Sequence, residues 1–286
     1  MDKEVEIFEK FLNEEDRKIM EIVIKDQTAF EVIKKLFEDP ENAEKYLILI
    51  KDNPHAVAIA AKLSESISRY LEGEEEDMCM RIFLRSLAFL GEFRDRKIPY
   101  DVFKIVKKAI DERIAIKKYE SAAKLVNLFY NLGFKNYVKK LIFHAMEVSD
   151  VGDHSRAIRI LNLLPFSEEV KMTKSYILVE WGKKLAASDP ELALKKIEEA
   201  LKIHEVPSAK LVMAEIFENL GNYPKAYEIY KSISDQPGIE KRLARLLMEW
   251  GEEEKDIRKL EEAKNLALCD PVLLEEIERR IRKIKS

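Results

Sequence analysis

The residue types that most often carry chemistry are few and scattered in this sequence. No H-E-x-x-H or C-x-x-C pattern joins its four histidines and two cysteines into a metal site. The nucleophile pattern G-x-S-x-G, the phosphate-binding pattern G-x-x-x-x-G-K-[ST] and the dinucleotide pattern G-x-G-x-x-G are also missing. Acidic pairs are common, but they lie in charge runs typical of solvent-facing helices. We therefore predict a protein that is not an enzyme and has no cofactor or bound metal.

Individual histidines and cysteines fit structural roles. His144 lies among apolar residues, and His154 occupies a helix position that faces a neighbouring helix, so both are predicted to have structural roles. Cys79 and Cys269 are too few for a disulfide framework, which indicates a reducing, cytoplasmic setting. The acidic N-terminus does not resemble a signal peptide, and no apolar stretch is long enough for a membrane span. Only two glutamines among 36% charged residues suggest a thermophilic source.

A basic region stands out against a net charge of −4. Residues 93–146 carry 13 basic and 5 acidic groups, whereas residues 1–92 carry 13 basic and 22 acidic groups. Tyr100, Tyr119, Tyr130 and Tyr137 are interleaved with the basic residues. One interpretation of region 94–140 is nucleic-acid binding through phosphate contacts. The other is a solvated face, or a charge complement to the acidic first 92 residues.

The elements that must position any site are helices, because apolar residues recur with helical spacing almost throughout. Four prolines follow a good N-cap residue, as in Asn53-Pro54, and each such pair predicts a helix start. Short connections predict antiparallel helix hairpins. The expected helices span residues 3–24, 28–37, 40–51, 54–71, 76–90, 99–116, 119–132, 136–149, 153–164, 168–186, 190–203, 207–220, 224–234, 239–254, 257–269 and 271–284.

A repeat of 33 to 37 residues runs through the C-terminal two thirds. Its mark is a small residue with larger residues three before and four after it, centred on Ala122, Ala157, Ala193 and Ala226, with a looser copy at Ala263. Alanine at such a position lets two helices approach closely, and a hairpin must stack on others to bury its apolar face. The sequence Glu-Trp-Gly also occurs twice, at residues 180–182 and 249–251.

The segment LGNYPKAYEIY (residues 220–230) resembles the second half of a tetratricopeptide repeat, and Ala214 and Phe217 match the first half. The resemblance is good for residues 207–236 and weaker elsewhere. It implies an all-α fold, a right-handed superhelix (solenoid) of antiparallel helix hairpins. We expect a helical region of possibly degenerate repeats over residues 1–98, repeats over 99–270 and a capping helix over 271–286.

In tetratricopeptide proteins the first helices of successive repeats line a concave groove that holds a peptide. With repeat starts at 103, 138, 174, 207 and 243, the resemblance places these candidates for partner binding in such a groove: Lys104, Lys107, Lys108, Asp111, Lys139, Ile142, Met146, Ser175, Leu178, Leu211 and Glu215. Phe143 and Gly182 also fall on groove positions, as do Ala244, Leu247 and Met248. The asparagines that hold a chaperone carboxylate in some family members are missing, so that ligand is disfavoured.

The sequence therefore favours a non-catalytic scaffold for protein-protein interaction. Its groove, basic at one end and apolar beyond, suits an amphipathic helix or a peptide with an acidic end. The alternative is a nucleic-acid-binding helical-repeat protein that uses region 94–140. Burial of the apolar groove residues by the protein itself or by a homo-oligomer is a third interpretation.

Overall fold

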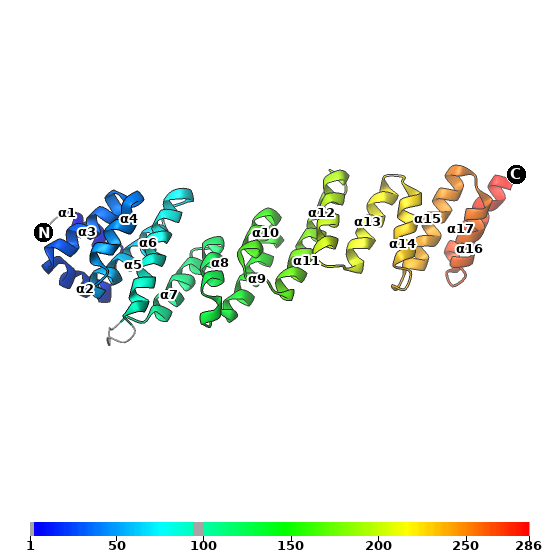
Figure 1. Ribbon diagram of the computed structural model, residues 1–286. Helices are drawn as coiled ribbons and strands as arrows, with labels where there is room; N and C mark the ends of the chain where they lie inside the picture. Colours follow the sequence, from blue (N-terminus) through cyan, green and yellow to red (C-terminus); the bar gives the residue numbers. More distant parts are fainter. Residues whose placement is uncertain (1–2, 94–99, 286) are drawn as a thin grey trace. The chain divides into compact units, whose positions relative to one another are not determined.

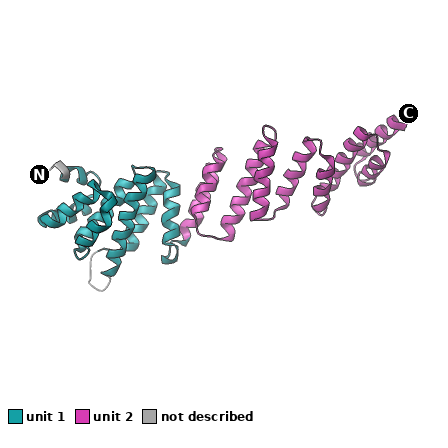
Figure 2. Cartoon of the chain, turned by 45° about the horizontal axis from the view of Figure 1, so that its top comes forward, with its two compact units in different colours: residues 1–135 teal, residues 136–286 magenta. Residues whose placement is uncertain are grey.

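The computed structural model describes residues 3–93 and 100–285, and within these ranges the chain is helical without any β-strand. The helices pack with their neighbours along the chain. The chain divides into two compact units, residues 1–135 and 136–286 (Figures 1 and 2). This boundary lies well beyond residue 98, where the weakening repeat signal places one. No described helix is long and apolar enough to cross a membrane.

Unit 1 contains eight α-helices and two short 3-10 helices among its described residues. They are α1 (Lys3–Glu9), α2 (Glu14–Lys25), α3 (Gln27–Glu38), η1 (Pro40–Asn42), α4 (Ala43–Ile50), α5 (Pro54–Ser68), α6 (Gly73–Glu92), α7 (Val102–Ala115), α8 (Tyr119–Leu128) and η2 (Tyr130–Leu132). The pairs α3/α4, α5/α6 and α7/α8 pack as hairpins.

Helix α5 forms the interior of unit 1. Its run of small and apolar residues from Ala56 to Ala61 is fully buried, and so are Leu63, Ser64 and Ser68. It packs along α6 and also contacts α2, α3 and α4. A helix buried on all sides needs small or apolar residues around its whole circumference, which its alanine and serine content supplies. Unit 1 is thus organised around one central helix.

Unit 2 holds the remaining helices, which again pack as hairpins, α11/α12, α13/α14 and α15/α16. They are α9 (Lys135–Asp150), which begins at the last residue of unit 1, α10 (His154–Leu163), α11 (Glu168–Leu185), α12 (Pro190–Ile203), α13 (Pro207–Asn219), α14 (Tyr223–Ser232), α15 (Ile239–Glu254), α16 (Ile257–Leu266) and α17 (Pro271–Lys285). Leu273, Ile277 and Ile281 of α17 cover the core of α15 and α16, as expected of a capping helix.

Most predicted helix starts are confirmed by their caps. Asn53, Asp189 and Asp270 each accept a hydrogen bond from a backbone amide three residues on. Asp39 does not cap a helix, because its carboxylate accepts hydrogen bonds from Asn42 and from Tyr46 Oη at 2.8 Å. The segment after Pro40 therefore begins as a 3-10 turn.

Two other helix predictions were wrong at their ends. The expected helix 3–24 is interrupted after Glu9, since Asn13 caps a second helix through the amide of Asp16. The acidic segment 72–75, which lies between the expected helices 54–71 and 76–90, mostly forms the first turn of α6. Carboxylates in a first turn are stabilised by the helix dipole, so an acidic run marks a helix start as readily as a loop.

Several hairpins of unit 2 close through the same turn. Gly152 and Gly221 adopt a left-handed backbone, with φ of 99° and 69°. The next amide in each case donates to the carbonyl five residues earlier, Asp153 to Val148 and Asn222 to Phe217. Asp153 and Asn222 then cap the following helix. This turn explains why the helix at Leu220 stops and another begins at once with Tyr223.

The two Glu-Trp-Gly segments build the same arrangement twice. Trp181 of α11 stacks on His154, and Trp250 of α15 stacks on Tyr223, each at the start of the preceding hairpin's second helix. A lysine from the helix that follows lies 4.4 Å over each indole ring, Lys196 in one case and Lys259 in the other. We call each set of three an aromatic clamp. It joins one hairpin to the next.

Candidate partner-binding surfaces

The glycine of each Glu-Trp-Gly segment lies where its helix packs tightly against the next helix, α12 in one case and α16 in the other. A Cβ on Gly182 would be 2.6 Å from Ile197 Cδ1, and a Cβ on Gly251 would be 2.9 Å from Leu260 Cγ. Gly182 is therefore the small contact residue of α11, as Ala145 and Ala214, both fully buried, are in α9 and α13. The repeat start at 174 had placed Gly182 in the groove instead. The register of α11 is thus shifted by one residue.

This shift corrects part of the predicted groove. Ser175 and Leu178 are fully buried. Ser175 Oγ donates to the carbonyl of Ala200 at 3.2 Å, and Leu178 belongs to the core between α11, α12 and α13. Ile142 is only 6% exposed, and Ala244, Leu247 and Met248 are buried in the core beneath α16 and α17. These residues hold hairpins together and are not available to a partner.

The other candidates of unit 2 reach the surface to different degrees. Lys139 and Met146 of α9 are exposed, whereas Leu211 and Glu215 of α13 are half-buried. The Glu215 carboxylate forms an ion pair with Arg242 of α15, so it is already engaged within the unit.

Counted from the small contact residue, the positions six before, two before and one after share one face of a helix. In α9 these are Lys139, Phe143 and Met146, and in α11 they are Tyr176, Glu180 and Lys183. Phe143 and Tyr176 are 59% and 53% exposed. Lys183 Nζ lies 2.6 Å from a Glu180 carboxylate oxygen. We call Lys139, Phe143, Met146, Tyr176 and Lys183 the α9/α11 face.

The basic candidates of unit 1 lie on α7. Lys104, Lys107 and Lys108 are exposed, and Asp111 is half-buried. Lys108 Nζ lies 3.9 Å from Glu112, and with that residue it lines a polar cavity of about 260 Å³ against α2 and α5. Burial raises the pKa of Glu112, although the nearby Arg69 opposes that rise. Helical spacing places the four candidates on one side of α7, and their role in partner binding stays a prediction.

Three residues of the basic region form ion pairs with the acidic first 92 residues. Arg113 is fully buried against Glu65, Lys118 lies 3.5 Å from Glu76, and Lys124 lies 3.0 Å from Asp77. Two of the interleaved tyrosines are also occupied. Tyr119 is buried, and Tyr100 Oη lies 2.6 Å from His55 Nδ1. These contacts favour the charge-complement interpretation over nucleic-acid binding. Arg94, Arg96 and Lys97 lie outside the described residues.

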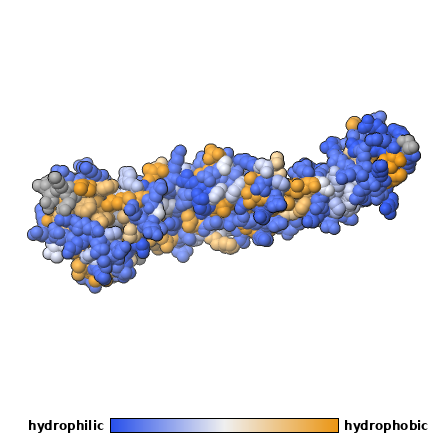
Figure 3. Space-filling view, turned by 90° about the horizontal axis from the view of Figure 1, so that it is seen from above, coloured by the Kyte–Doolittle hydropathy of each residue, from blue (hydrophilic) through white to orange (hydrophobic). Residues whose placement is uncertain are grey.

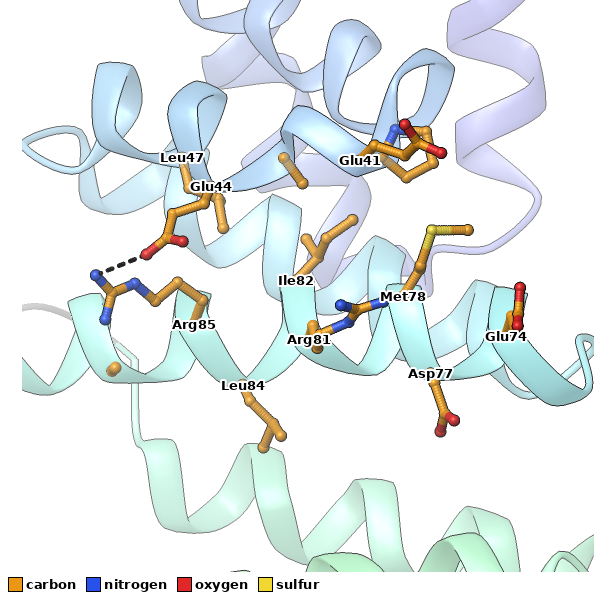
Figure 4. Close-up of a pocket in the computed structure, with 13 residues that line it drawn as sticks. Glu41, Glu44, Leu47, Glu74, Asp77, Met78, Arg81, Ile82, Leu84 and Arg85 are labelled. Atoms are coloured by element: carbon orange, nitrogen blue, oxygen red, sulfur yellow. Dashed lines mark ion pairs between the residues drawn. The ribbon is translucent and has the colours of Figure 1, made fainter.

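One concavity was not anticipated from the sequence. A groove of about 930 Å³ runs between η1/α4 and α6 in unit 1, on second helices of hairpins and not on first helices (Figure 4). The sequence offers little evidence of this groove, because neither the exposed charged residues of α6 nor the 3-10 turn after Pro40 belongs to a repeat pattern.

Both packing histidines were interpreted correctly. His154 is buried, with Nδ1 2.8 Å from Ser149 Oγ, and burial lowers its pKa. His144 Nδ1 lies 2.7 Å from a Glu147 carboxylate oxygen. Among the described residues, no three histidine, cysteine or acidic side chains are grouped so that they could hold a metal ion.

No protein-family model matches this chain, and no curated protein is significantly similar to it.

Proposed function

We propose that the protein is a non-catalytic scaffold that binds a helix or peptide of a partner protein on the α9/α11 face. The observation that carries this proposal is the exposure of two aromatic side chains, Phe143 and Tyr176, on the same outward face of the first helices of two successive hairpins. Figure 3 shows exposed hydrophobic residues among an otherwise hydrophilic surface. Exposed aromatic side chains with polar surroundings are typical of interaction surfaces.

The chemistry of the α9/α11 face indicates the kind of partner. Phe143, Met146 and Tyr176 offer apolar contact, and Met172, 53% exposed, lies one helical turn before Tyr176. Lys139 and Lys183 flank them and are exposed, and Lys183 would exchange its contact with Glu180 for one with the partner. A partner segment with an apolar stripe and acidic flanking residues would bury its stripe against these side chains. Its acidic residues would pair with the two lysines.

The double variant F143E/Y176E tests this proposal. Two glutamates would remove the apolar contact and repel acidic flanks, so we expect partner capture from the native cell to fall by about tenfold or more. The measurement is quantitative mass spectrometry after affinity capture. The thermal unfolding midpoint should stay unchanged, because both side chains are exposed.

The matched control is V151E/L220E, which makes the same charge change at two exposed apolar residues, 85% and 52% accessible, at hairpin turns. This control should retain the partner. A partner that binds F143E/Y176E as well as it binds the unaltered chain would show that the α9/α11 face is not the binding surface.

A further inference from the structure

We propose that the groove between η1/α4 and α6 is a second binding site, which takes an amphipathic helix of a partner protein carrying a basic residue at one end. The site is independent of the α9/α11 face, since all its lining residues belong to unit 1.

The floor of the groove is apolar. Ala43 and Leu47 contribute from α4, and Ile82 contributes from α6, each less than one tenth exposed. Met78 and Leu84 are half-buried along the same lining. A volume of about 930 Å³ is at the upper end of the range for ligand sites, and is large enough for several side chains of a docked helix.

The rim of the groove is charged, and its two ends differ. At one end Arg85 pairs with Glu44, with 3.2 Å between the guanidinium nitrogen and the carboxylate oxygen (Figure 4). Toward the other end, where α6 begins, Glu41 and Glu74 are exposed and form no ion pair with any described residue. Arg81 lies between the two ends, exposed and likewise without an ion pair among the described residues.

This charge pattern selects the occupant. Two unpaired carboxylates at one end call for a lysine or arginine, and Arg81 calls for an aspartate or glutamate. Glu74 and Arg81 are seven residues apart on α6, about 10 Å along the helix axis. A helix lying alongside would therefore carry its basic and acidic residues two turns apart, on the edge of an apolar stripe. A helix suits the site because its backbone hydrogen bonds are satisfied internally, so the groove need supply only apolar contacts and charged partners.

A yeast-displayed library of short amphipathic helices tests the site, with a fixed leucine and alanine stripe and randomised flanking residues. Selection against the full chain should enrich lysine or arginine at one end and an acidic residue seven positions away. The E41K/E74K variant should weaken binding of the selected helices by about tenfold or more. The R81E variant should shift the second preference from acidic to basic residues.

Two controls make the result decisive. E6K/E21K changes the net charge equally at exposed residues of α1 and α2, which do not line the groove, and should leave affinity within about twofold. The F143E/Y176E variant should also bind the selected helices normally, so this test and that of the α9/α11 face can fail separately. A library without binders, or binders indifferent to E41K/E74K, would overturn the proposal.

Discussion

Arg113 is the largest side chain among the fully buried residues that the structure describes. Its guanidinium donates to Ser121 Oγ, Ser68 Oγ and the carbonyl of Ala109, at 3.0, 2.7 and 3.1 Å, and it pairs with Glu65. Glu65 also pairs with Arg69, whereas no second carboxylate of the described residues lies within ion-pair distance of Arg113. The two members of the pair are therefore not equivalent, since only Glu65 would keep a partner after loss of the other.

We expect this asymmetry to show in unfolding experiments. Glu65→Met leaves the buried Arg113 without a counter-ion and should cost roughly 3–5 kcal/mol in the free energy of unfolding. Arg113→Met should cost less, because Glu65 retains Arg69. The double variant should recover part of the loss. The free energy of unfolding of the three variants can be measured by urea denaturation, and hydrogen exchange of the α5 amides reports the local effect. A larger cost for Arg113→Met than for Glu65→Met would contradict the proposed asymmetry of the pair.

Asp256 shows a different residue-scale effect, one that depends on pH. Its carboxylate caps α16 through the amide of Arg258 and accepts from Lys259 Nζ at 2.9 Å. These contacts, led by the Lys259 hydrogen bond, lower its pKa from 3.8 to about 2. Because the folded pKa is depressed, the stabilisation from this carboxylate is present above its unfolded pKa and is lost as pH falls through about 2.

A carboxyl NMR titration should accordingly place the midpoint of Asp256 near 2. Between pH 4 and 2, Asp256→Asn should lose less stability than the unaltered chain, because asparagine keeps a capping oxygen without titrating. A midpoint near 4 would mean that the Lys259 contact does not persist in solution.

At the scale of elements, close helix packing at glycine decides the register of the hairpins. Gly182 and Ala193 are eleven residues apart, whereas Ala145/Ala157 and Ala214/Ala226 are each twelve apart. The α11/α12 turn also has no left-handed residue of the kind found at Gly152 and Gly221. A hairpin can thus keep its close helix packing when the small residues of its two helices are eleven instead of twelve residues apart. The one-residue difference changes which residues of the first helix face outward.

Substitution of two helical glycines, Gly182 and Gly91, by alanine tests this packing. Gly91→Ala should stabilise α6 by up to about 1 kcal/mol, since no atom of the described residues lies within 4 Å of its new methyl group. Gly182→Ala gains the same helix propensity but overpacks Ile197, at a cost of roughly 1–3 kcal/mol, so we expect a net loss. Adding Ile197→Val, which removes the nearest methyl, should restore part of that loss. Equal thermal shifts in both single variants would contradict the close contact.

Particular residues show how far the sequence could lead. Helices, caps at Asn53 and Asp189 and the hairpin at Gly221 followed from local rules, because periodicity, capping and left-handed glycine act within a few residues. Register across a hairpin depends on which side chain faces a helix some ten residues away, so the buried positions of Ser175 and Leu178 were missed. The repeated Glu-Trp-Gly pattern was the available signal. In both copies the glycine after the tryptophan lies where the helix packs closely against the next helix.

At the scale of the whole molecule, the two units use helix hairpins differently. Unit 1 surrounds α5, whose faces contact several helices, and it carries the groove between α4 and α6. Unit 2 buries its core in successive clusters, each shared by three consecutive helices, such as α11, α12 and α13. The groove could not be foreseen because it depends on the separation of helices distant in sequence. The two proposed binding sites therefore belong to units with different interiors.

The aromatic clamps also determine how many hairpins must be added or removed together when this chain is lengthened or shortened. The tryptophans are 69 residues apart, and each stacks on the first residue of the preceding second helix. We expect excision of one such block to bring Trp250 to His154 in place of Trp181, with Lys259 replacing Lys196. Excision of a single hairpin would leave a tryptophan without its ring partner. The module of duplication, deletion and engineered fusion in unit 2 is thus a pair of hairpins.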